Sequence, residues 1–101
     1  MYNVLISNKY LEDVEDIFSY IASTLCNVDA ALNLKEKLNI EIERLTHYPF
    51  VNSPIETKQN YLFEYRKVKI GNYYMLYYVE NMTIIIARLI YAKRDFDNLK
   101  I

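Results

Sequence analysis

The sequence has one glycine, two prolines, one cysteine and no tryptophan among its 101 residues. So little glycine and proline leaves few positions for irregular loops, and we expect most residues to lie in helices and strands. The single cysteine, Cys26, excludes an internal disulfide and is typical of a reducing, cytoplasmic setting. No apolar run approaches the roughly 20 residues of a membrane span, and the N-terminus turns acidic where a signal peptide would be apolar. We therefore expect a cytoplasmic protein with no membrane partner.

Sequence motifs for cofactor or metal chemistry are also missing. There is no glycine-rich phosphate loop and no CxxC or HxxxH spacing, so we predict no cofactor and no metal. The only histidine, His47, is interpreted as a cap or surface residue at a helix C-terminus. The acidic group Glu12, Asp13, Glu15 and Asp16 is interpreted as a solvated helix face, because neighbouring helix positions point in different directions.

What the chain does contain is apolar surface and an uneven charge distribution. Hydrophobic residues make up 52% and charged residues 25% of the sequence, which excludes a disordered chain. We expect one domain, 1–101. Residues 1–57 carry four basic and nine acidic side chains, a net −5, whereas residues 58–101 carry eight basic and four acidic ones, a net +4. This split predicts a positive face on the C-terminal half.

The N-terminal half has the pattern of a strand followed by two helices. Asn3 to Ser7 is a short apolar run, and Ser7 or Asn8 can cap the helix that follows. Asn27 to Asp29 breaks the helical pattern and offers a second cap. Steps of three and four define two apolar stripes: Leu11, Val14, Ile17, Ile21 and Leu25, then Ala31, Leu34, Leu38, Ile42 and Leu45. The pair is predicted to form an antiparallel helical hairpin ending near His47.

The C-terminal half has the pattern of three strands joined by tight turns. The predicted strands are Tyr61–Ile70, Tyr73–Val79 and Thr83–Tyr91, with turns at Gly71-Asn72 and Asn81. The predicted fold is α+β in the order β-α-α-β-β-β, with the helical hairpin packed on one face of a mainly antiparallel four-stranded sheet. Because the strands are apolar on both faces, we expect a partner or the tail from Ala92 onward to cover the other face.

Basic residues on these strands are the candidate functional groups. Alternation places Lys67 and Lys69 on one face and Arg66 on the other. Arg88 lies among isoleucines, so we expect it either to pair with a carboxylate, Glu64 or one from the helices, or to reach a groove. If the cations converge with Arg94, they form a site for an RNA phosphate or a carboxylate-rich peptide. The eleven tyrosines could stack on bases, but packing is the favoured interpretation.

The segment YLFEYRKVKIGNYYMLYYVENMTIIIARLIYAKRDFDNL, together with the LEDVEDIFSYI and IERLTHYP stretches upstream, resembles the RelE/ParE superfamily of bacterial toxins. The resemblance covers essentially the whole chain. It extends to the plasmid stabilisation proteins, which belong to the same superfamily. It implies a type II toxin that arrests growth until a cognate antitoxin neutralises it. RelE-like members cut mRNA on the ribosome, and ParE-like members inhibit DNA gyrase.

The resemblance also implies roles for individual residues. Were the chain a metal-independent mRNA endoribonuclease, Arg66, Lys67, Lys69 and Arg94 would be its catalytic residues. Partner binding is expected from Arg88, Tyr91, Lys93 and Asp95. Tyr74 stands where RelE-like toxins carry an arginine, and no tyrosine follows Arg94. These departures favour gyrase inhibition over mRNA cleavage; a degenerate member that binds only its antitoxin is the third alternative, and a homodimer is expected when the antitoxin is absent.

Overall fold

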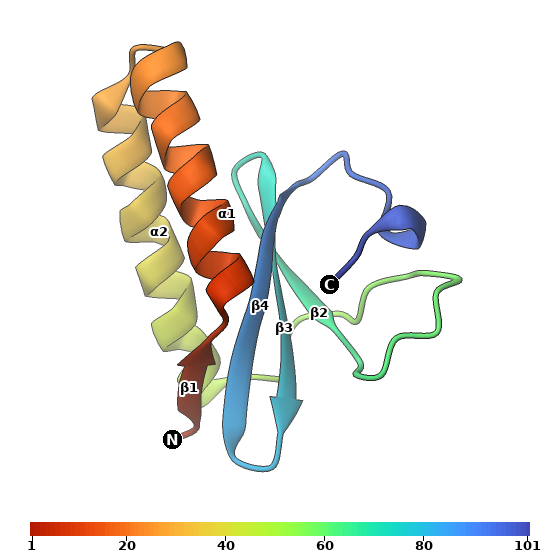
Figure 1. The fold of residues 1–101 in the computed structure, drawn as a ribbon. Coiled ribbons are helices and arrows are strands. Elements are labelled where there is room, and N and C mark those ends of the chain that lie inside the picture. Colours follow the sequence, from red (N-terminus) through yellow and green to blue (C-terminus); the bar gives the residue numbers. More distant parts are fainter.

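The computed structural model describes residues 1–101, and its elements follow the predicted β-α-α-β-β-β order (Figure 1). The elements are β1 (Asn3–Ile6), α1 (Asn8–Ser19), a π-helical turn (Tyr20–Thr24), α2 (Val28–His47), β2 (Arg66–Ile70), β3 (Tyr73–Glu80), β4 (Thr83–Tyr91) and a 3-10 turn (Phe96–Asn98). The four strands are ordered β1-β4-β3-β2, with β1 parallel to β4 and the other pairs antiparallel. The predicted α+β class is confirmed, and the sheet is mixed.

Both helices begin at the caps that the sequence indicated. The Ser7 hydroxyl accepts a hydrogen bond from the Tyr10 amide at 3.0 Å, and the Asn27 side chain accepts one from the Ala30 amide at 3.0 Å. Each cap satisfies an amide that the helix itself leaves unpaired. No helix combines the length and the apolar character that a membrane crossing requires.

The single cysteine does not belong to the core. Cys26 has a φ of 51° and lies exposed in the link between the π-helical turn and α2. The link stands at the tip of the helical hairpin, beyond the end of the sheet, so nothing is available to cover the side chain (Figure 1).

The main core lies between the helical hairpin and one face of the sheet. Ten buried residues form it: Tyr10, Leu38, Leu45, Val68, Ile70, Met75, Tyr77, Ile84, Ile86 and Leu89. Side chains of β2, β3 and β4 supply its sheet half, as expected of strands that turn one face toward helices. We call this face of the sheet the helix face.

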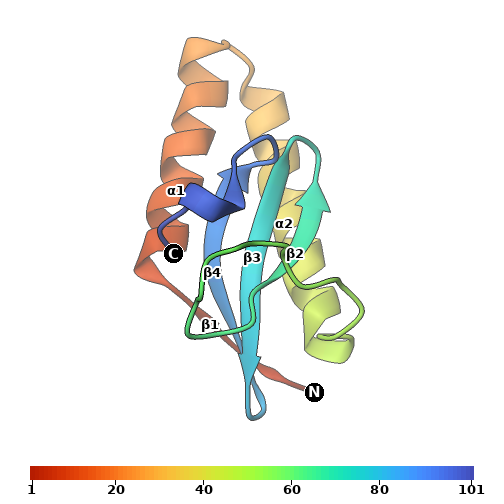
Figure 2. The ribbon, with the colours of Figure 1, turned by 90° about the vertical axis from the view of Figure 1, so that its right-hand side faces the viewer.

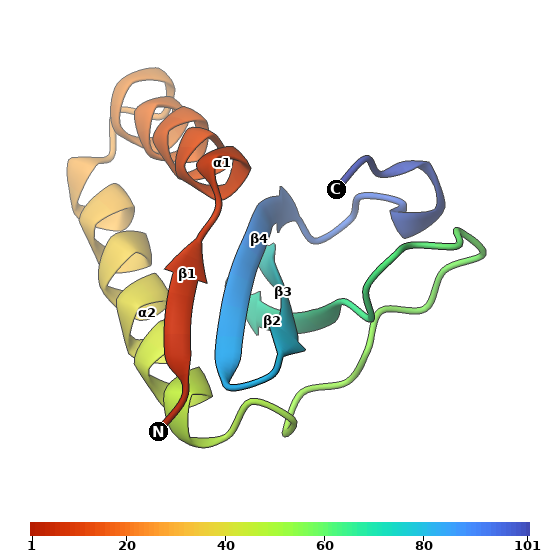
Figure 3. The ribbon, with the colours of Figure 1, turned by 60° about the horizontal axis from the view of Figure 1, so that its bottom comes forward.

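The opposite face of the sheet is covered by the C-terminal tail and by the long loop between α2 and β2 (Figures 2 and 3). Leu99 is 1% exposed and packs with Leu76 and Ile90, and Phe96 packs against this cluster. We call this the tail face. The sequence left open whether a partner or the tail covers it, and the tail does. The apolar surface from which a homodimer was expected is therefore largely buried within the chain, and the homodimer stays a prediction.

The strand predicted over 61–70 was too long, because β2 begins only at Arg66. Residues 61–65 cross the tail face instead of extending the strand (Figure 2). Phe63 stacks on Tyr78 of β3 with ring centroids 4.0 Å apart and an interplanar angle of 9°. This aromatic contact lies across the sheet rather than along its edge, so it competes with strand pairing at residues whose β-propensity is high.

Asp97 fastens the tail to the long loop. Its Oδ1 accepts hydrogen bonds from the Lys58 amide at 2.6 Å and the Thr57 hydroxyl at 2.8 Å. The Tyr61 hydroxyl adds a bond to the Phe96 carbonyl at 2.8 Å. The Lys58 amide and then the Thr57 hydroxyl lower the pKa of Asp97 below its ordinary value of 3.8, because both stabilise the carboxylate.

We expect the Asp97→Ala variant to increase hydrogen exchange at the Lys58 amide by about tenfold at pH 7. A depressed carboxyl pKa stabilises the fold above the ordinary value, and this contribution disappears as the pH falls through the lowered value. The wild-type and variant exchange profiles, corrected for intrinsic rates, should therefore converge in acid. Asp97→Asn is the matched control, since its amide oxygen still accepts both bonds. A difference that persists unchanged however far the pH is lowered beneath the ordinary value of 3.8 would contradict this account.

Candidate functional site

A β-bulge in β4 decides where Arg88 points. Leu76 pairs with Arg88, but the next residue of β3, Tyr77, pairs with Ile86, so Ala87 is an extra residue on β4. Such an insertion reverses the alternation of the side chains beyond it. Ile84 and Ile86 therefore pack on the helix face, whereas Arg88 stands on the tail face. Arg88 therefore does not share a face with Ile84 and Ile86, two of the isoleucines among which it lies in the sequence.

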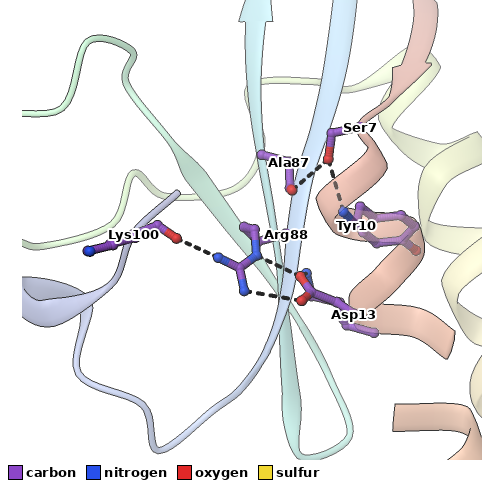
Figure 4. Close-up of polar contacts among 7 residues, drawn as sticks. Ser7, Tyr10, Asp13, Ala87, Arg88 and Lys100 are labelled. Carbon is purple, nitrogen blue, oxygen red and sulfur yellow. Dashed lines mark hydrogen bonds and ion pairs between the residues drawn. The ribbon is translucent and has the colours of Figure 1, made fainter. Parts of the chain in front are cut away.

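Arg88 forms an ion pair with Asp13 of α1 (Figure 4). Arg88 Nε donates to Asp13 Oδ2 at 2.7 Å and Nη2 donates to Oδ1 at 3.1 Å, and the Leu89 amide also donates to Oδ2 at 3.0 Å. The two side chains are 14% and 16% exposed. The interpretation of Asp13 as part of a solvated face was wrong, whereas a helix carboxylate does pair Arg88 as the sequence allowed.

The guanidinium of Arg88 also holds the end of the chain. Its Nη1 donates to the carbonyl of Lys100, so Arg88 connects α1, β4 and the C-terminal tail (Figure 4). All three of its bonded nitrogens are directed at groups within the chain. Its sequence-derived role in partner binding stays a prediction.

A polar pocket of about 440 Å³ opens over this ion pair, and no hydrophobic side chain lines it. Its lining residues are Lys9, Glu12, Asp13, Arg88, Arg94, Asn98 and Lys100. We call it the cationic pocket. Lys9, Arg94 and Lys100 are exposed, and none of them forms an ion pair within the chain. Four cations face two carboxylates, one of which Arg88 already neutralises, so the pocket favours an anion.

The other predicted catalytic cations lie elsewhere. Arg66 donates to the Asn52 carbonyl at 2.6 Å, pairs with Glu64 at 3.1 Å and lies over the ring of Phe50 at 5.2 Å. Arg66 is thus engaged at the edge of the sheet, where β2 is the outermost strand.

Lys67 lies on the tail face, with its ammonium 5.2 Å from the ring centroid of Tyr74 and 5.5 Å from that of Phe96. Lys69 follows it on β2 and is exposed. Only Arg94 of the four candidate catalytic residues reaches the cationic pocket. The structure therefore does not bring Arg66, Lys67, Lys69 and Arg94 around one cavity.

The remaining partner-binding candidates are also spread out. The ring of Tyr91 lies 6.0 Å from that of Tyr73 beside the helical hairpin. The Asp95 carboxylate accepts from the Asp97 amide at 2.9 Å and from the Asn98 side chain at 2.8 Å, so it caps the 3-10 turn. Lys93 is exposed without an ion pair.

Sequence reasoning missed Lys9 and Lys100 as members of the pocket. The sequence does contain an indication for Lys9, because a cation in the first turn of a helix interacts unfavourably with the helix dipole. A residue that is unfavourable in its own helix is a candidate for a role outside it. Lys100 left no comparable signal.

Tyrosines of the C-terminal half pack with one another, as the favoured interpretation held. Tyr65 makes edge-to-face contacts with Tyr61 at 5.6 Å and with Tyr78 at 5.4 Å. Burial raises the pKa of Tyr65, and the neighbouring Tyr78 and Tyr61 raise it further. No group of three or more histidine, cysteine, aspartate or glutamate side chains is placed to hold a metal ion.

Known proteins resemble this chain in sequence pattern and in fold. A family model described as the ParE toxin of type II toxin-antitoxin system, parDE, matches residues 4–96. The structure is similar to the chromosomal ParDE TA system from P. aeruginosa, with a TM-score of 0.72, 14% identity, and coverage of 92% of this chain and 98% of that chain. It is also similar to the RelB-RelE antitoxin-toxin complex from Methanococcus jannaschii, with a TM-score of 0.55, 16% identity, and coverage of 88% and 91%. No curated protein matches the sequence.

Proposed function

Because the chain belongs to the ParE toxin family of type II toxin–antitoxin systems, we propose that it arrests growth by binding and inhibiting a target such as DNA gyrase. A cognate antitoxin holds it inactive until that antitoxin is lost. The solved relatives are themselves toxin–antitoxin systems, which supports an antitoxin as its partner.

We choose inhibition by binding over RNA cleavage because the candidate catalytic cations lie apart. Cleavage of RNA needs a proton acceptor, a proton donor and cations around a single phosphate. Here Arg66 is engaged by Asn52 and Glu64, and Lys67 lies over aromatic rings on the tail face. Arg94 lies apart from both in the cationic pocket. This arrangement supports inhibition by binding over catalysis.

One observation favours mRNA cleavage as a second candidate. Arg94 shares the cationic pocket with Lys9, Arg88 and Lys100, and such a set of cations suits a phosphate group. A metal-independent endoribonuclease acting there would use Arg94 to stabilise charge on the phosphate.

Induced expression with and without the neighbouring reading frame tests the proposal. We expect growth arrest only in the absence of the neighbour, with intact transcripts, an induced DNA-damage response and relaxed plasmid DNA. Purified protein should inhibit supercoiling by gyrase in vitro.

Other outcomes separate the alternatives. Transcripts cut within codons, with the cuts abolished by Arg94→Ala but not by Lys35→Ala on α2, would replace gyrase inhibition by mRNA cleavage. Unaffected growth, with the neighbouring protein still bound, would leave a member that only binds its antitoxin.

A further inference from the structure

A second hollow adjoins the cationic pocket and shares Lys9 with it. This hollow has a volume of about 250 Å³ and is lined by Ser7, Asn8, Lys9, Tyr65, Tyr78, Ile85, Ala87 and Ile101. Five of its lining side chains are apolar or aromatic, whereas the cationic pocket has none. We call these two hollows, which both include Lys9 in their lining, the docking groove, with an apolar half and a cationic half.

The wall between the halves is held firmly by α1. The Ser7 hydroxyl donates to the carbonyl of the bulged Ala87 at 2.7 Å while it caps the helix (Figure 4). The Asp13–Arg88 pair fixes the same helix to β4 at a second point, four residues after Lys9. Lys9 therefore projects from a backbone that is tied to the sheet on both sides. A groove formed in advance loses less conformational entropy when it binds.

The charges of the cationic half are available to a ligand. Arg88 is neutralised by Asp13, which leaves Lys9, Arg94 and Lys100 against Glu12 alone. These three cations come from α1, the turn after β4 and the C-terminal tail, so only the folded chain brings them together. Their complement is an anionic ligand with several charges.

The apolar half distinguishes a peptide from a nucleic acid. A base would need a free ring face, but one face of Tyr78 is stacked on Phe63 at 4.0 Å and Tyr65 meets Tyr78 edge-on. Ile85 and Ala87 instead offer room for an aliphatic side chain.

We propose that the docking groove binds an acidic segment of the antitoxin, with an aliphatic side chain in the apolar half and carboxylates beside Lys9, Arg94 and Lys100. The inference rests on the proposed toxin–antitoxin function and adds the surface and chemistry of recognition. The sequence placed the expected antitoxin contacts at the end of β4. The proposal places them instead in the docking groove, to which α1 and the C-terminal tail also contribute.

The test measures binding of the protein encoded by the neighbouring reading frame, by calorimetry, to full-length variants of this chain. We expect Lys9→Glu with Arg94→Glu to weaken binding by about 30-fold, because two attractive pairs become repulsive. Lys35→Glu with Lys37→Glu on α2 is the matched control, with the same change in net charge and an expected effect within about threefold. Raising the salt concentration should weaken wild-type binding more than binding of the groove variant.

Two milder variants keep the test decisive if the charge reversal impairs folding. Lys9→Gln with Arg94→Gln should weaken binding by about tenfold, and Ile85→Ala should also weaken it, by about fivefold. Thermal melts establish that each variant is folded.

The other possible binding results lead to different conclusions. Equal binding by wild type, groove variants and control would overturn the docking groove and leave the toxin–antitoxin proposal standing. No binding even by wild type would overturn both. Weaker binding by the control pair than by the groove pair would place the antitoxin on α2. A single-stranded RNA that competes with the partner for wild type but not for the Lys9/Arg94 variant would identify the groove as a nucleic-acid site.

Discussion

Replacing Asp13 by alanine should lower the free energy of unfolding by about 3 kcal/mol, an effect typical of breaking a largely buried ion pair. The change leaves the Arg88 guanidinium, 14% exposed, without its carboxylate, and it removes the acceptor of the Leu89 amide. It also loosens the attachment of α1 to β4. Urea denaturation followed by circular dichroism measures the loss.

The neighbour Glu12 provides the control for Asp13. Glu12 is exposed, lines the same pocket and forms no ion pair, so Glu12→Ala should change stability by less than about 0.5 kcal/mol. Adding Arg88→Met to Asp13→Ala should recover part of the loss, because it removes the charge that was left unpaired. Equal effects of Asp13→Ala and Glu12→Ala would show that the pair contributes nothing.

Replacing Tyr77 by alanine should cost about 4 kcal/mol, the loss expected when a buried aromatic side chain is removed from a core. Tyr77 is completely buried at the centre of the helix face. Its hydroxyl donates to the Pro49 carbonyl at 2.6 Å and accepts from the Asn52 side chain at 3.2 Å. The ring therefore fills the core while the hydroxyl anchors the start of the long loop.

Tyr77→Phe separates these two roles. It keeps the ring and leaves the buried Pro49 carbonyl without its donor, so it should cost about 1 to 2 kcal/mol. Because the hydroxyl also accepts a bond from the Asn52 side chain, amide exchange in the loop should increase in this variant. Denaturation of both variants in parallel measures the two contributions. A phenylalanine variant as unstable as the alanine variant would mean that the core depends on the hydroxyl rather than on the ring.

The elements that the sequence predicted correctly are those whose causes are local. Ser7 and Asn27 cap helices through bonds to amides three residues away, and the apolar stripe of α2 follows from helical periodicity. The turns at Gly71 and Asn81 carry the positive φ values, 59° and 56°, that such tight connections require. The resemblance to the RelE/ParE superfamily was confirmed by the family model.

The candidate site was predicted less well, because its residues depend on contacts distant in sequence. Arg94 reached the pocket that it was expected to form, but Arg66, Lys67 and Lys69 did not. Alternation along a strand correctly separated Arg66 from Lys67. It could not reveal that loops and aromatic rings would engage each of them. Lys9 and Lys100 joined the pocket through the packing of α1 and the tail.

The sequence alone determined the order of the elements and the amphipathic helices, since both follow from local periodicity, caps and turns. Its resemblance to the RelE/ParE superfamily indicated the family. The tertiary structure decided which cations meet. The bulge at Ala87 turned Arg88 from the helix face to the tail face, where Asp13, 75 residues earlier in the chain, became its partner. A bulge is a feature of the pairing between two strands, in which two residues of one strand oppose one residue of the other, so the alternation along β4 alone did not predict it.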